Sequence, residues 1–162
     1  WLQEPEKKVE DCFHEAAELG TKVYPGEEAE TVQKLLQLAV TFAKDETLTP
    51  LAALSMLGCT TTEQSLAGAV YSCVYSEDNF DNALIAAVNH SGRSCAVAAV
   101  TGAFMGARLG AEALPGFYLE SLPQVQTLCE LARDIAQGAA AYGAFDTDWD
   151  QKYNQGQPVN TD

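Results

Sequence analysis

Three features are scarce in this sequence of 162 residues, and each scarcity excludes a class of protein. Lys and Arg number 9 against 23 Asp and Glu, and the formal net charge of −14 argues against nucleic acid or an anionic membrane as a partner. Apolar runs are short, and the one from Ala83 to Val88 is far too short to span a bilayer. No strand-like alternation of any length occurs, which argues against a β fold.

Closely spaced cysteine pairs are also lacking. The five cysteines are Cys12, Cys59, Cys73, Cys95 and Cys129. Most of them occupy apolar helical positions, where a free cysteine behaves as a small hydrophobe. An odd number of cysteines without any C-x-x-C pair indicates free thiols in a reducing compartment. We therefore expect a cytoplasmic protein without a disulfide framework.

Helical periodicity is present along most of the chain. The clearest case is residues 27–44, where apolar residues keep the 3.6-residue period and acids occupy the first turn. Further helices are predicted over 6–19, 50–58, 63–75, 79–88, 96–110, a short stretch at 117–119, and 122–137. Gly20, Gly58 and Gly138 are predicted to end helices. Thr49, Thr60–Thr62, and either Ser76 with Asn79 or Asp78 itself are predicted to begin them. These signals predict an all-α fold.

One loop and the helix after it stand out. The loop is Asn89-His90-Ser91-Gly92-Arg93-Ser94-Cys95, and small residues recur at every fourth position of the helix that continues to Gly110. The two small-residue series are Ala98, Gly102, Gly106 and Ala99, Ala103, Ala107. Interior glycines cost roughly 1 kcal/mol each relative to alanine, so we expect close packing to offset them and place this helix at the centre of a bundle. The loop's free backbone N–H groups are expected to point outward, where an anion or a metal ion would bind.

These same residues carry a family resemblance. The matching runs are Val88-Asn89-His90-Ser91-Gly92, Thr101-Gly102-Ala103…Gly106-Ala107…Leu109-Gly110…Ala113-Leu114-Pro115, and Gly58…Glu63-Gln64-Ser65-Leu66-Ala67…Val70-Tyr71. Over residues 19–137 they closely resemble the C-terminal half of ADP-ribosylglycohydrolases (dinitrogenase reductase-activating glycohydrolase-like proteins). The resemblance implies a compact orthogonal helical bundle, two magnesium ions, and removal of ADP-ribose from proteins or related conjugates.

The sequence departs from the family at the residues that the resemblance assigns to metal binding. There the family loop continues with Asp, a small residue, Asp, and Ser or Thr, whereas this chain has Arg93, Ser94, Cys95 and Ala96. Magnesium requires hard oxygen ligands, which a guanidinium or a thiol does not supply. Arg93, Cys95 and Ala96 are therefore predicted to be degenerate metal-site positions, and we expect no bound metal and no cofactor in this chain.

The resemblance also implies a longer domain. The family's N-terminal half supplies the other metal ligands and a catalytic acid, and no match to that half occurs in this sequence, which begins with Trp1. We expect an incomplete copy of the family domain over residues 1–145, followed by a polar C-terminal tail over 146–162. We predict no catalytic residue: a nucleophilic Cys95 would need a base, and only His90 is near it in sequence.

Three functional hypotheses remain open. The first is a degenerate relative, a pseudoenzyme or ADP-ribose-binding remnant, in which Arg93 stands where a metal ion stood. The ligand-binding candidates are then Asn89, His90, Ser91, Gly92, Arg93 and Ser94. The second is an active ADP-ribosyl hydrolase completed by an N-terminal segment. The third is a structural or oligomerisation module. The expected partners are ADP-ribose or a related nucleotide, a second copy of the chain, or the absent N-terminal half.

Overall fold

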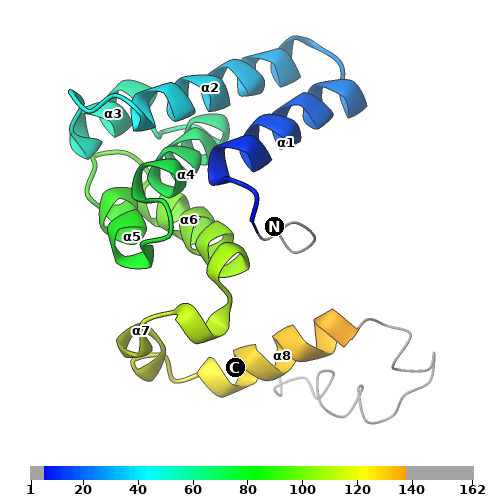
Figure 1. Ribbon diagram of the computed structural model, residues 1–162, viewed down its shortest axis with the longest axis vertical. Helices are drawn as coiled ribbons and strands as arrows, with labels where there is room; N and C mark the ends of the chain where they lie inside the picture. Colours follow the sequence, from blue (N-terminus) through cyan, green and yellow to red (C-terminus); the bar gives the residue numbers. More distant parts are fainter. Residues whose placement is uncertain (1–5, 138–162) are drawn as a thin grey trace, which may run out of the picture. The chain divides into compact units, whose positions relative to one another are not determined.

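The computed structural model describes residues 6–137, and over this range the chain is helical, with no strand (Figure 1). The elements in order are α1 (Val9–Val23), α2 (Glu27–Ala43), α3 (Pro50–Leu57), α4 (Thr62–Ser76), α5 (Phe80–Val88), α6 (Ser94–Leu109), the 3-10 helix η1 (Ala111–Ala113), α7 (Gly116–Glu120) and α8 (Val125–Gln137). The predicted all-α class is confirmed.

The chain divides into two units. The first ends at Pro115 and the second begins at Gly116. All residues of the buried hydrophobic core belong to the first unit, within α1–α6 and the short connections between them. The predicted boundary between residues 145 and 146 lies outside the described residues.

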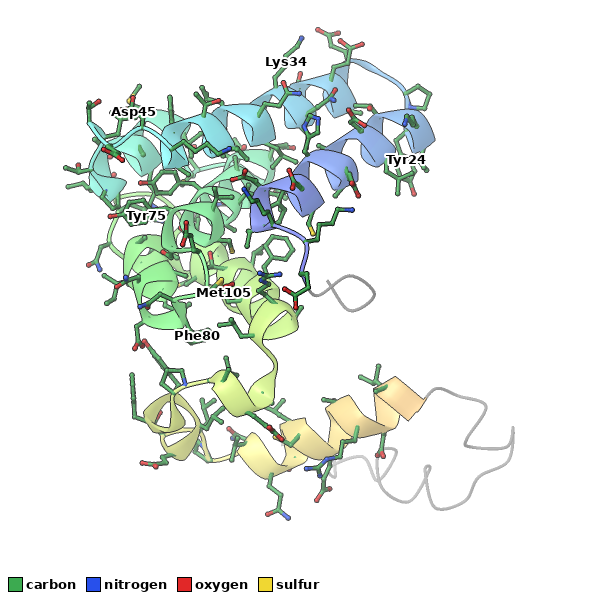
Figure 2. All side chains as sticks on the ribbon, viewed as in Figure 1. Tyr24, Lys34, Asp45, Tyr75, Phe80 and Met105 are labelled. Carbon is green, nitrogen blue, oxygen red and sulfur yellow. The ribbon has the colours of Figure 1, made fainter. Side chains whose placement is uncertain are left out.

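The centre of the first unit is α4. Ten of its 15 residues are buried, and it packs against α1, α2, α3, α5 and α6. In contrast, α6 buries only Val97, Thr101 and Met105, of which Met105 is labelled in Figure 2. The prediction that the small-residue helix forms the centre is therefore wrong. The larger residues of α6, four positions apart, face the core, because burying them removes more apolar surface from water than burying alanines does.

The small residues of α6 lie mostly away from this core. Ala99, Ala103 and Ala107 are exposed. A side chain added at Gly106 would meet no atom within 4 Å, and one added at Gly102 would first meet Leu84, at 3.9 Å. Close packing against another helix of the first unit therefore does not explain these two glycines.

Most of the predicted helix ends are confirmed by hydrogen bonds. Thr49 caps α3, where its hydroxyl accepts from Ala52 N at 3.3 Å, and Pro50 follows at the first helical position. Gly58 ends α3 with φ +85°, a conformation that favours glycine. At the start of α5, the Asn79 side chain accepts from Asn82 N at 2.9 Å.

Two local expectations are corrected. Gly20 does not end α1, which continues to Val23, because an interior glycine is tolerated where the following turn keeps its hydrogen bonds. The last described helix, α8, begins at Val125 and not at the predicted residue 122. The predicted end of this helix at Gly138 lies outside the described residues.

Candidate functional site

The loop that carries the candidate residues connects α5 to α6. Asn89 ends α5, and its side-chain Nδ2 donates to Ile85 O at 2.7 Å. The backbone N–H of Arg93 donates to Cys59 O at 2.7 Å, so the far end of the loop is attached to the connection between α3 and α4. This hydrogen bond joins the α5–α6 loop to the α3–α4 connection at the N-terminus of α6.

Gly92 makes this attachment sterically feasible. A Cβ at position 92 would lie 2.6 Å from Cys59 O and 2.8 Å from Cys59 Cβ, which is closer than real Cβ atoms come. Cys59 is fully buried and has φ +50°, in the left-handed region that non-glycine residues rarely adopt. A Cβ at Gly68 of α4 would lie 2.6 Å from Cys59 Sγ, so Cys59 is held between two glycines.

Sequence reasoning missed the role of Cys59. Its position after the α3 terminator Gly58 marks a turn, but nothing local indicates that its carbonyl receives a hydrogen bond from Arg93. Burial raises the pKa of the Cys59 thiol to about 11, which keeps it neutral at physiological pH. Its role is to pack and to anchor the loop.

The backbone amides at the start of α6 are largely used within the chain. Ser94 N donates to Gly92 O at 2.8 Å, and Ala96 N and Val97 N both donate to Arg93 O at 3.0 Å. Within the loop, the N–H groups of Gly92, Arg93 and Ser94 therefore already have acceptors, His90 Nδ1 in the case of Gly92. The expectation of a loop with free N–H groups is wrong for these three.

His90 shapes the interior of the loop. Its Nδ1 accepts a hydrogen bond from Gly92 N at 3.0 Å, so in the neutral ring the proton resides on Nε2. Nε2 is buried and has no hydrogen-bond partner among residues 6–137. An unsatisfied buried donor costs free energy, so the ring is placed by the loop's geometry at some cost to stability.

The side chains that follow differ in exposure. Arg93 and Cys95 are exposed, Ser94 is partly buried, and Ala96 is exposed. The Arg93 guanidinium forms no ion pair with any described residue, so its positive charge is not neutralised by a neighbouring carboxylate. The candidates Asn89 to Ser94 thus lie in one anchored loop with a single cation at its end.

The donor atoms of this loop do not fit magnesium. Positions 93, 95 and 96 offer a guanidinium, a thiol and a methyl group, and the nearest hydroxyl is that of Ser94. Magnesium requires several hard oxygen ligands in near-octahedral geometry. Within residues 6–137 no group of three or more His, Cys, Asp or Glu side chains is placed so that it could hold a metal ion.

A comparison with protein families agrees with the sequence motifs. The family model described as ADP-ribosylglycohydrolase matches residues 2–144. The match spans most of the chain, which belongs to the ADP-ribosylglycohydrolase family. No curated protein and no solved structure gives a match. Among the described helices, none is both long and apolar enough to cross a membrane.

Proposed function

We propose that this chain is a degenerate ADP-ribosylglycohydrolase-family domain that binds ADP-ribose without magnesium and lacks the family's metal-dependent hydrolysis. One observation carries the proposal: Arg93, in place of a carboxylate that the family resemblance implies, is fixed through its backbone to Cys59, while its guanidinium is exposed and forms no ion pair with a residue that the structure describes. A positive charge therefore occupies the position from which a carboxylate would hold a metal ion.

The chemistry of a guanidinium favours a diphosphate as its ligand. Arginine presents N–H donors in a planar fork that matches the oxygens of a phosphate group, and such charge-assisted pairs are stronger than neutral hydrogen bonds. In the family, magnesium would neutralise negative charge at this place. In this chain the guanidinium supplies that positive charge directly, and the pyrophosphate of ADP-ribose would bind it.

The same substitutions weigh against hydrolysis. A metal ion speeds cleavage by polarising oxygen atoms and by activating water, and it needs carboxylate ligands to be held. Arg93 repels a divalent cation, and the Cys95 thiol is a poor substitute for a carboxylate. The alternative of an active hydrolase completed by a further segment would require magnesium to be held without this loop.

The test is calorimetric titration of ADP-ribose into the full chain, in buffer with magnesium chloride and in buffer with EDTA. We expect the same affinity in both buffers and loss of binding in Arg93→Ala. The matched control is Arg133→Ala, which removes another exposed arginine, from α8, and should leave the affinity unchanged.

Two results would contradict the proposal. Binding that requires magnesium would favour the alternative of a metal-dependent hydrolase. Absence of binding in both buffers would remove ADP-ribose as the ligand and favour the structural or oligomerisation hypothesis.

A further inference from the structure

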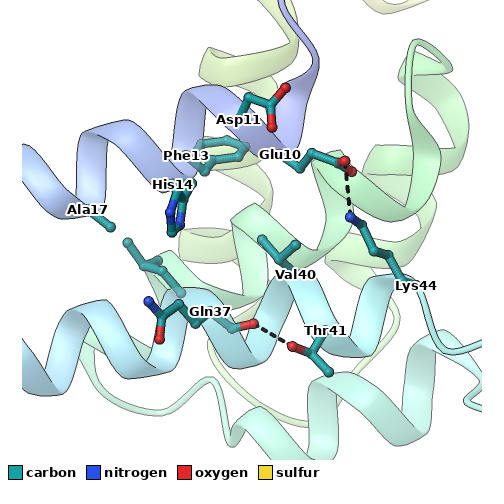
Figure 3. Close-up of a pocket in the computed structure, with 10 residues that line it drawn as sticks. Glu10, Asp11, Phe13, His14, Ala17, Gln37, Val40, Thr41 and Lys44 are labelled. Carbon is teal, nitrogen blue, oxygen red and sulfur yellow. Dashed lines mark hydrogen bonds and ion pairs between the residues drawn. The ribbon is translucent and has the colours of Figure 1, made fainter.

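A groove of about 310 Å³ lies between α1 and α2, and it shares no residue with the loop at 89–96 (Figure 3). Its floor is apolar. Phe13, Ala17 and Leu36 are each less than a tenth exposed, and Val40 beside them is partly buried. The ring of Phe13 packs edge-on against Phe104 at 5.0 Å between centroids, which fixes the floor on the α1 side. A volume of this size is at the lower end of the range for small-molecule sites.

The rim of the groove is polar and partly occupied by internal bonds. Glu10 and Lys44 form an ion pair of 3.0 Å between α1 and α2, visible in Figure 3. The Thr41 hydroxyl donates to Gln37 O at 2.9 Å, so it is already used by its own helix. His14 contacts Glu18 at 3.3 Å between Nε2 and Oε1.

The charge left over at the rim is negative. The Glu10 carboxylate offsets the Lys44 ammonium, whereas the carboxylate of Asp11, which also lines the groove, has no ion-pair partner among the described residues. The chain as a whole carries a formal charge of −14, which raises the local concentration of cations near its surface. An anionic ligand would meet two carboxylates and an ammonium that is already paired.

We propose that this groove binds a small organic ammonium ion. The apolar body of the ligand lies over Phe13 and Leu36, and its ammonium group faces Asp11 at the rim. The apolar floor gives the free energy of burial, and the unpaired carboxylate selects the sign of the charge. A compact aromatic or branched aliphatic amine fits this combination in size and charge.

The first test is an NMR titration of the full chain with 2-phenylethylammonium, observing the methyl groups of Leu36 and Val40. We expect saturable shifts confined to the α1–α2 groove. In Asp11→Asn the affinity should fall by roughly fivefold, as for loss of one exposed charge pair. The matched control is Glu46→Gln, an exposed acid beyond the end of α2 that does not line the groove.

Two further probes and one variant complete the test. Phenylacetate and 2-phenylethanol keep the aromatic body but reverse or remove the charge, and both should bind more weakly than the ammonium. Gln37 is exposed on the rim, so Gln37→Trp covers the floor without changing the core, and it should abolish the methyl shifts at unchanged thermal stability. Equal binding of phenylacetate, full binding in Gln37→Trp, or no saturable shift at Leu36 and Val40 would overturn the proposal.

Discussion

Cys59 is the residue on which the position of the 89–93 loop depends. Its carbonyl accepts the Arg93 N–H, its Cβ and carbonyl contact Gly92, and its sulfur lies against Gly68. The left-handed φ of +50° at a non-glycine residue costs free energy that the surrounding contacts must offset. A change at either glycine therefore acts on the loop through Cys59.

Replacing Gly92 by alanine tests this contact. The added methyl group would lie 2.6 Å from a backbone oxygen, which cannot move aside like the end of a flexible side chain. We expect a loss of about 1–3 kcal/mol in the free energy of unfolding, measured in urea. The control is Gly106→Ala in α6, where nothing lies within 4 Å and the gain in helix propensity should stabilise by up to about 1 kcal/mol. Equal stability of the two variants would refute the tight Cys59–Gly92 contact.

A second prediction at residue scale concerns alkaline pH. Burial raises the pKa of the Cys73 thiol to about 12. Because the folded pKa is above the unfolded one, the neutral thiol's contribution to stability is fully present below about pH 8.5 and is lost as pH rises toward 12. The expected loss from this group between pH 8 and 10.5 is about 2 kcal/mol.

Urea unfolding at the two pH values measures this loss. Cys73→Ala should lower stability at pH 8, because it leaves a cavity, but it should also reduce the decline toward pH 10.5. The exposed Cys95 is the matched position, and Cys95→Ala should decline as the unmodified protein does. An unchanged decline in Cys73→Ala would mean that this thiol does not titrate on unfolding.

At the scale of the element, α4 begins with a reciprocal capping box. The Thr61 hydroxyl accepts from Gln64 N at 3.3 Å, and Gln64 Oε1 accepts from Thr61 N at 3.2 Å and from Thr60 N at 3.1 Å. These bonds satisfy N–H groups that a helix start otherwise leaves without partners. Since α4 contributes more residues to the hydrophobic core than any other helix, its start affects the stability of the whole first unit.

Thr61→Ala should therefore cost about 1 kcal/mol of unfolding free energy, whereas Thr61→Ser should keep the cap. The neighbouring Thr62 is exposed and its hydroxyl takes no part in this capping box, which makes Thr62→Ala the matched control. Chemical denaturation of the three variants gives the comparison. If Thr62→Ala is as destabilising as Thr61→Ala, the effect belongs to helix propensity and not to the cap.

The elements could be predicted from the sequence where their signals are local. Thr49-Pro50, Gly58 and Asn79 act through hydrogen bonds within one helical turn. The residue types at these positions are therefore sufficient to predict the helix ends. The position of α6 in the bundle could not be predicted. The spacing of its small residues permits another helix to approach closely, but it does not determine which face of α6 packs against the core. In the candidate site, the family motif indicates the run Asn89 to Gly92, and Arg93 and Ser94 follow it directly. The bond from Arg93 to Cys59 joins segments that no local pattern relates.

At the scale of the whole molecule, the two units differ in how much they bury. The first unit contains the entire described core, whereas no residue from 116 to 136 is buried. Leu128 and Ile135 give α8 an exposed apolar side. A helix of 13 residues is marginal in water without tertiary packing, so the two units should differ in local stability.

Hydrogen exchange resolved by segment measures this difference. Amides of α4 open only with the core, whereas those of α7 and α8 open locally, so we expect protection in α4 to exceed that in α8 by roughly a thousandfold or more. The experiment should be run at two protein concentrations. Equal protection at both concentrations would refute the difference between the units. Protection of α8 that rises with concentration would instead show that a second copy covers its apolar side, since burial at an interface stabilises the helix by mass action.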